Sequence, residues 1–247
     1  MERIAIFAAL GWECRPVLRQ MRQVIRERAG DFTVWRSVTS RHEVVLVKTG
    51  MGIVRAEAAA RSIGNGGDCS LFMSTGCAGA LAAELVPGDV VVATAVVASS
   101  SDGQFDTHTE HRGRAERAAQ RAALRVTTGP ALCSPQALLT ALHKRTAAAQ
   151  YGAVAVDMEG ESIAAEAARR AIPFILVRAI LDTADTELKH TGRFIDPQTG
   201  AVRPLALAGY VATHPGAVTD LLAMQRMMRA AQASLERFFA AWFTEDA

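Results

Sequence analysis

Residues 153–182 read AVAVDMEGESIAAEAARRAIPFILVRAILD, and this stretch carries the clearest fold signal in the chain. Two short apolar runs, Ala153–Val156 and Phe174–Val177, are typical of strands in a sheet that is covered on both faces. The segment between them, Glu161–Ala171, has the pattern of a helix. The stretch therefore predicts a strand–helix–strand unit of an α/β sheet.

Carboxylates stand where both predicted strands end. Asp157 and Glu159 follow the first strand, and Asp182 follows the second. In open α/β sheets, ligands bind in the crevice outside the carboxyl ends of the strands, so these acids are candidates for chemistry. The alternative is structural, because each acid could instead cap the next helix or pair with Arg178.

The same alternation of apolar runs and helical patterns extends in both directions. Strands are expected at Arg3–Ala9, Val34–Val38, Val44–Thr49, Cys69–Ser74, Val90–Val97 and Val126–Leu132. Helices are expected at Glu13–Arg28, Val54–Ile63, Pro135–Ala148 and Pro215–Phe243. Polar composition predicts a long surface loop at Ser99–Arg114 and a second polar stretch at Asp185–Pro204.

The chain has 247 residues, of which 50% are hydrophobic, so it can bury one substantial core. No linker or repeat divides it, and we expect a single domain spanning residues 1–247. The formal net charge is only +2. Because the basic residues are spread along the chain with few aromatics among them, a nucleic-acid partner is not expected.

The four cysteines, Cys14, Cys69, Cys77 and Cys133, include no C-x-x-C pair. This spacing suggests neither a zinc site nor a disulfide framework, so we interpret them as reduced thiols. No signal peptide and no apolar stretch long enough to span a bilayer is evident in the sequence. We therefore expect a cytoplasmic protein.

Two loops of small residues, Gly50–Gly52 and Thr75–Gly79, each follow a predicted strand. Small residues allow backbone amides to come close to a ligand, although either loop could equally be a tight turn. Neither has the glycine spacing of a dinucleotide site or of a phosphate-binding loop. Glu13, in the first turn of the first helix, could by itself be an ordinary surface residue.

Taken together, five motifs occur in a characteristic order. They are Ala8–Arg15, Thr49–Gly52, Ser74–Leu81 with Pro87–Val91, Val156–Gly160, and Val177–Asp185. In this order they resemble the purine nucleoside phosphorylase and uridine phosphorylase superfamily, and most closely its methylthioadenosine/S-adenosylhomocysteine nucleosidases. The resemblance covers residues 1 to about 185. It implies a three-layer α/β/α sandwich with a mixed central sheet and a nucleoside phosphorylase-like architecture.

The resemblance also implies a role for each acid. Glu159 matches the residue that binds the ribose 2′ and 3′ hydroxyls, since a carboxylate can accept from both, and Met158 would pack on the sugar. Asp182 matches the acid that protonates N7 of the purine, and burial would help it to keep its proton. Glu13 matches the glutamate that positions and deprotonates the attacking water.

Further residues are placed around the substrate by the same resemblance. Met51 would lie near the ribose, the segment Ser74–Gly79 near the sugar and the nucleophile, and Leu138 and Leu139 beside the base. Asp157 is a further candidate for substrate binding, and a structural role is the alternative for this residue. The catalytic candidates are thus Glu13 and Asp182, and the substrate-binding candidates are Met51, Cys77, Ala78, Gly79, Leu138, Leu139, Asp157, Met158 and Glu159.

The implied reaction is hydrolysis of the N-glycosidic bond of an adenine-type nucleoside, with no metal and no cofactor. The glycine-aspartate-proline type of phosphate loop is absent from Ala8–Glu13, which favours water over phosphate as the nucleophile. Phosphorolysis, with phosphate as a second substrate, remains the alternative. A nucleoside-binding module without activity is a third hypothesis, because Leu138 replaces an aromatic residue and Leu181 replaces a small polar one.

Residues from about 190 onward form a C-terminal extension that ends in the long helix. The segments Phe194–Gly200 and His214–Gly216 are similar to the hopanoid-associated branch, which removes adenine from adenosylhopane, a lipid-like nucleoside. The helix is rich in apolar residues and carries Arg226, Arg229 and Arg237, so peripheral membrane contact is one hypothesis. Packing on the sheet or in a dimer interface is the other. The resemblance implies a homo-oligomer, with a dimer expected.

Overall fold

The computed structural model describes residues 2–38, 42–101, 103–187 and 217–244. The strands in this part of the chain are β1 (Glu2–Ala8), β2 (Ile25–Ala29), β3 (Phe32–Val38), β4 (His42–Lys48), β5 (Leu71–Ala80), β6 (Val90–Ala98), β7 (Gln104–Asp106), β8 (Val126–Cys133), β9 (Ala155–Asp157) and β10 (Phe174–Asp182). The helices are α1 (Gly11–Leu18), α2 (Ile53–Asn65), α3 (Thr109–Arg121), α4 (Ala141–Tyr151), α5 (Gly160–Arg169) and α7 (Ala217–Thr244).

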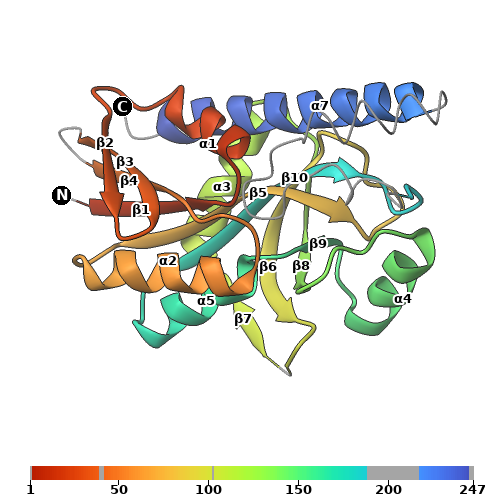
Figure 1. Cartoon of the computed structure of the whole chain (residues 1–247), viewed down its shortest axis with the longest axis horizontal. Coiled ribbons are helices and arrows are strands. Elements are labelled where there is room, and N and C mark those ends of the chain that lie inside the picture. The colour runs from red at the N-terminus through yellow and green to blue at the C-terminus, as the bar shows by residue number, and fades with distance from the viewer. Residues whose placement is uncertain (1, 39–41, 102, 188–216, 245–247) are drawn as a thin grey trace.

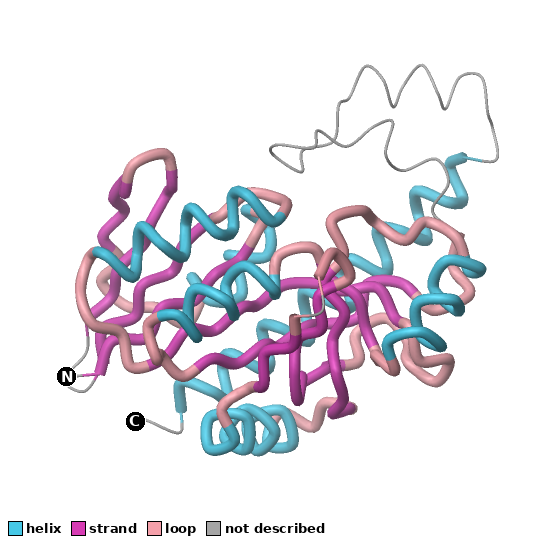
Figure 2. The backbone as a smooth tube through the Cα atoms, turned by 90° about the horizontal axis from the view of Figure 1, so that it is seen from below, coloured by secondary structure: helices cyan, strands magenta, loops and turns pink. Residues whose placement is uncertain are grey.

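The strands form one mixed sheet in the order β10-β6-β8-β9-β5-β1-β4-β3-β2, with β7 paired to β6. β10 also pairs with β5, so the strands β5, β9, β8, β6 and β10 form a closed ring. Helices α1, α3 and α7 cover one face of the sheet (Figure 1). Helices α2 and α5 lie together on the opposite face, which Figure 2 turns towards the viewer. The predicted three-layer sandwich with a mixed sheet is confirmed.

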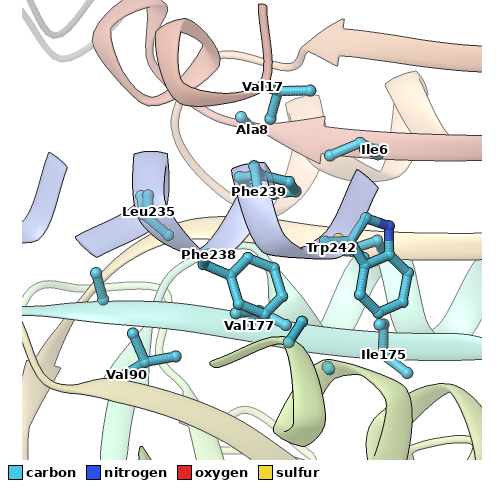
Figure 3. Packing of buried hydrophobic residues seen from close by; sticks show 14 of the residues in the cluster. Ile6, Ala8, Val17, Val90, Ile175, Val177, Leu235, Phe238, Phe239 and Trp242 are labelled. Carbon is cyan, nitrogen blue, oxygen red and sulfur yellow. The ribbon is translucent and has the colours of Figure 1, made fainter. Parts of the chain in front are cut away.

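The C-terminal half of α7 belongs to the core. Leu235, Phe238, Phe239 and Trp242 are fully buried and pack on β1 and β10 (Figure 3). Arg237 donates to the carbonyl oxygens of Ala122 and Ala123 at the end of α3. Packing on the sheet, one of the two hypotheses for this helix, is therefore confirmed for these four apolar residues.

The N-terminal half of the same helix is less covered. Leu222 is 49% exposed, and Leu221, Met224, Met227 and Met228 are only partly buried. None of the helices in the described ranges combines the length and the apolar character that crossing a bilayer requires. The motifs Phe194–Gly200 and His214–Gly216, and the polar stretch from residue 188 onward, lie outside the described residues.

The predicted helix Glu13–Arg28 is wrong in its second half. α1 ends at Leu18, and Ile25–Ala29 forms the edge strand β2, which pairs antiparallel with β3. Gln23, which lies between α1 and β2, has a φ of 50° and so adopts the left-handed backbone conformation. The residues from Gln20 to Arg28 suit a helix locally, but pairing with β3 overrides that preference.

The predicted loop Ser99–Arg114 is also wrong over most of its length. It contains the short strand β7 and the first turns of α3, which starts at Thr109. α3 buries only Ala115, Ala118 and Ala119 against the sheet. Since alanine contributes little to an apolar stripe, the pattern of this helix looks uniformly polar in the sequence.

Two further boundaries differ from the prediction. The helix expected at Pro135–Ala148 is α4, which begins at Ala141 after Thr140, whose hydroxyl accepts from His143 N–H at 3.2 Å. The segment 135–140 is therefore free to form one wall of a cavity. Thr75–Gly79, expected to be a loop, continues β5, because it pairs with β10 from Val177 to Ile180 and again at Asp182, with a register shift at Leu181.

Candidate active site

A cavity of about 220 Å³ lies at the carboxyl ends of β5, β9 and β10. Its walls are mainly apolar, with a few carboxylates, which is the usual character of a small-molecule site. All residues proposed from the sequence line it: Glu13, Met51, Cys77, Ala78, Gly79, Leu138, Leu139, Asp157, Met158, Glu159 and Asp182. Leu10, Trp12, Gln136, Lys144, Val156 and Leu181 also contribute to the walls.

The parallel pairing of β5 and β10 fixes the position of Asp182 in the cavity. Asp182 is the last residue of β10, and its register partner on β5 is Gly79. Asp157 likewise ends β9, which pairs with β5 through Gly79 and Ala80. The parallel strand-end rule therefore accounts for Asp182. β9 runs antiparallel to β5, so Asp157 is brought to the same site by that pairing and not by the rule from which the sequence prediction started.

The carboxylate of Glu13 connects α1 to β5. Oε2 accepts from Leu10 N–H at 2.9 Å, and Oε1 accepts from Cys77 N–H at 2.8 Å. Gly76, at φ 144°, permits this approach, because a Cβ atom there would lie 2.7 Å from Glu13 Oε1. Burial raises the pKa of Glu13, while the two backbone amides oppose that shift. Glu13 is thus held by the protein and is not a surface residue.

Glu159 is held in a similar way by the loop before α2. Its Oε1 accepts from Gly52 N–H at 2.8 Å. From the sequence, the glycine loops could either bring backbone amides to a ligand or form tight turns. In the described structure, the amides of Gly52 and Cys77 donate instead to the carboxylates of Glu159 and Glu13. The glycines therefore orient the acids that face the cavity.

Burial raises the pKa of Glu159 to about 7, and the negative charge of Asp157 adds to the effect. The hydrogen bond from Gly52 and the charge of Arg178 act in the opposite direction. Near neutral pH, this carboxyl group is therefore divided between its protonated and ionised forms. As a carboxylate it can accept two hydrogen bonds, and as an acid it can donate one.

Replacing Glu159 with glutamine should stabilise the protein above neutral pH. The folded state binds the Glu159 proton more tightly than the unfolded chain, so its contribution to stability falls as pH rises from 4.5 through about 7. The glutamine oxygen still accepts from Gly52. We expect the free energy of unfolding to rise by about 1–3 kcal/mol at about pH 8, and by much less at about pH 5.

Urea unfolding at the two pH values measures this difference. Glu161→Gln is the matched control, since Glu161 lies in the first turn of α5 and its side chain makes an exposed contact with Ser100 at 3.4 Å. A gain of equal size at both pH values, or a loss at the higher one, would contradict the expectation.

Asp157 meets both structural alternatives raised by the sequence. Its Oδ2 accepts from the guanidinium of Arg178, with Nε at 3.1 Å, and from Gly160 N–H at 3.0 Å at the start of α5. Both Asp157 and Arg178 are almost completely buried. Asp157 lines the cavity, but its Oδ2 already accepts hydrogen bonds from Arg178 and Gly160. These contacts favour a structural role.

Arg178 is a site residue that sequence reasoning treated only as an ion-pair partner. Its Nη2 donates to Ser74 Oγ at 2.7 Å. It also lines a second cavity of about 10 Å³, together with Glu13, Glu159 and Thr75. The Thr75 hydroxyl is buried and has no hydrogen-bond partner among the described atoms. A polar space of this size can hold one water molecule between Glu13 and Arg178.

Asp182 makes an ion pair that the sequence did not reveal. Lys144 of α4 donates to Asp182 Oδ2, and both side chains are almost fully buried. Burial raises the pKa of Asp182, and the ammonium of Lys144 opposes the shift. The only sequence signal was a lysine in an alanine-rich helix, which is normally a surface position. Among the described residues, those of the cavity included, no group of three His, Cys, Asp or Glu side chains is placed to hold a metal ion.

Comparison with known proteins places this site in a family context. A family model described as Phosphorylase superfamily matches residues 3–204. A 5′-methylthioadenosine/S-adenosylhomocysteine nucleosidase from Actinobacillus succinogenes is 27% identical over 202 residues, which cover 75% of this chain and 87% of that protein.

Solved structures share the fold at low sequence identity. A mutant of the Helicobacter pylori 5′-methylthioadenosine/S-adenosyl homocysteine nucleosidase, with 5′-methylthioadenosine in its active site, has a TM-score of 0.79 at 17% identity and covers 99% of both chains. The Neisseria meningitidis enzyme in complex with methylthio-immucillin-A has a TM-score of 0.79 at 19% identity over 100% of both chains. A futalosine hydrolase mutant from Helicobacter pylori has a TM-score of 0.78 at 17% identity, covering 99% of this chain and 100% of that one.

Proposed function

The chain belongs to the phosphorylase superfamily, and on that basis we propose that it is a nucleosidase that hydrolyses the N-glycosidic bond of an adenine-type nucleoside and releases the free base. The names of the matched nucleosidases and of the futalosine hydrolase support hydrolysis as the reaction class. Three carboxyl groups around one cavity, the buried Glu13 and Asp182 and the partly buried Glu159, are the observation that carries the proposal, and each is held by different partners.

Each of the three carboxyl groups acts on a different reactant: Asp182 on the base, Glu159 on the sugar and Glu13 on the water. Asp182 donates its proton to N7 of the purine as the bond between C1′ and N9 breaks and the electron pair of that bond moves to the base. The sugar then passes through an oxocarbenium-like state. A water oxygen bonds to C1′, and Glu13 takes the proton which that water loses. Glu159 accepts hydrogen bonds from the 2′ and 3′ hydroxyls.

The small cavity beside Glu13 supports water as the nucleophile. Its volume of about 10 Å³ suits a single water molecule. The guanidinium of Arg178, which would be the natural ligand of a phosphate, is already engaged by Asp157 and Ser74. Phosphorolysis is the second candidate, because Arg178 nevertheless borders this space and a phosphate could displace its partners.

Adenine release tests the proposal directly. The protein is incubated with 5′-methylthioadenosine, S-adenosylhomocysteine and adenosine, with and without inorganic phosphate, and the products are separated by chromatography. We expect free adenine and a free sugar at a rate that does not depend on phosphate. A sugar 1-phosphate would instead identify a phosphorylase. Binding of these nucleosides without any base release would identify a binding module and contradict the proposed reaction.

The finer features of the proposal depend on the resemblance. They are an adenosylhopane-like substrate, a cytoplasmic single-domain protein and a homodimer. Peripheral membrane contact through α7 would have to use its N-terminal half, where Leu222 is exposed, because Phe238, Phe239 and Trp242 are buried in the core. The apolar walls formed by Leu10, Trp12 and Leu138 are compatible with an apolar substituent on the nucleoside.

A further inference from the structure

Lys144 is an unusual lysine, because its side chain is only 1% exposed although it lies on a helix at the edge of the molecule. A buried ammonium is costly unless acceptors surround it. Its Nζ donates to Asp182 Oδ2, to Thr183 O at 2.7 Å and to Thr186 O at 3.2 Å. These three acceptors match the three N–H donors of the lysine ammonium.

The turn that supplies the two carbonyls is itself held in place. Thr186 N–H donates to Thr183 O at 3.1 Å, and Thr183 N–H donates to Thr186 Oγ1 at 3.2 Å. The two threonine hydroxyls are 2.8 Å apart. The turn directly follows β10, so the strand that ends in Asp182 and the carbonyls that bind Lys144 form one unit. This arrangement fixes the position of the ammonium relative to Asp182.

Asp182 depends on this contact for its orientation. Its chain neighbour Leu181 has no polar group in its side chain, and among the described residues Lys144 is the one side chain that donates to Asp182. Lys144 also lines the cavity, so the pair stands at its wall. The contact occupies Oδ2, while Oδ1 has no donor from the described part of the protein.

The other charged groups around the cavity are mostly acids. Glu13 faces it from α1, Asp157 from the end of β9, and Glu159 from the segment between β9 and α5. The charge of Arg178, on β10, is directed to Asp157. Cys77, on β5, is the remaining titratable neighbour, and burial raises the pKa of its thiol well above the ordinary value. Lys144 is therefore the cation that contacts Asp182 itself.

We propose that Lys144 is a positioning residue for the reaction proposed above: it orients the carboxyl group of Asp182 towards the base and sets the pH above which that group no longer donates a proton. The inference rests on the proposed function. Both effects have one cause, because the same ammonium holds Oδ2 by a hydrogen bond and stabilises the ionised carboxylate.

Removing the charge should change the pH profile as well as the rate. In Lys144→Met, burial of Asp182 is no longer opposed by a cation, so its pKa rises. The alkaline limb of kcat/KM should move upward by about 1–3 pH units. Loss of orientation should lower kcat at the optimum by about 10- to 100-fold. Lys144→Arg keeps the charge, so it should keep the limb near its native position and lower only kcat.

Arg145→Met is the matched control, since Arg145 is the next residue of α4 and makes an exposed ion pair with Asp185. It should leave both the limb and kcat unchanged. A Lys144→Met enzyme with a lower rate but an unmoved alkaline limb would overturn the proposal, because a purely structural lysine would give that result. A shifted limb in Lys144→Arg would overturn it as well.

A second measurement does not require turnover. The carboxyl ¹³C resonance of Asp182, assigned by its loss in Asp182→Asn, is titrated in the native protein and in the Lys144 variants without substrate. A higher midpoint in Lys144→Met supports the inference, and an unchanged midpoint overturns it. If the native protein cleaves no nucleoside, the proposed function fails while this titration still reports on the pair. If Lys144→Met does not fold, Lys144→Gln, which also removes the charge, takes its place in this titration: a higher midpoint supports the inference, and an unchanged midpoint overturns it.

Discussion

Asp182→Asn should lower kcat/KM for base release by about 10²- to 10⁴-fold, the range typical of a lost general acid. Asparagine has nearly the same shape as aspartic acid but has no proton to give to N7. Its side-chain oxygen can still accept from Lys144, so the cavity should keep its form. Adenine release under steady-state conditions measures the loss.

The same change removes the counter-charge of a buried ammonium, so a lower midpoint of thermal unfolding is also expected. Activity is therefore compared at a temperature where circular dichroism shows that the variant is folded. Asp185→Asn is the matched control, because Asp185 is three positions further along the chain and its side chain is 79% exposed. Turnover by Asp182→Asn within a few-fold of the native rate would rule out Asp182 as the acid.

Arg178→Met should cause the largest loss of stability of any change in the site, about 3–5 kcal/mol. Arg178 is 2% exposed and pairs with Asp157, which is also buried. The substitution leaves Asp157 with a buried and uncompensated charge, and Ser74 loses its donor. Because the charge of Arg178 also lowers the pKa of Glu13 and Glu159, both acids should bind protons more tightly in the variant.

Urea unfolding measures this loss, and the double variant Asp157→Asn/Arg178→Met tests its cause. If the uncompensated carboxylate is responsible, the double variant should recover part of the lost stability. Arg145→Met is the surface control, where breaking an exposed pair should cost about 0–1 kcal/mol. A loss in Arg178→Met no larger than in that control would contradict the assignment.

The sequence predicted the site well because its acids follow local patterns. Apolar runs that end in Asp157 and Asp182 predict strand ends whether or not the rest of the fold is known. The strand–helix–strand unit is confirmed, with the helix at Gly160–Arg169. The two interpretations of Asp157, helix cap and partner of Arg178, are both correct, since one carboxylate oxygen makes both contacts.

What the sequence could not show depends on contacts between distant segments. Lys144 meets Asp182 across 38 positions, and nothing near either residue indicates the pair. The absence of a polar side chain at Leu181 left the orientation of Asp182 open, and the donor comes from another helix. α3 was missed because its buried face consists of alanines, and β2 was missed because only its partner strand makes it extended.

The closed ring of β5, β9, β8, β6 and β10 leaves β2 as the long open edge of the described sheet. An open edge offers unpaired backbone groups to other molecules and is a common starting point for aggregation. In β2 this edge is occupied by Arg26, Glu27 and Arg28, which are exposed. Charged side chains on an edge strand are one of the ways by which proteins discourage pairing with another chain. The residues that suit a helix in the sequence thus place charges along the one edge of the sheet where charges disfavour edge-to-edge pairing.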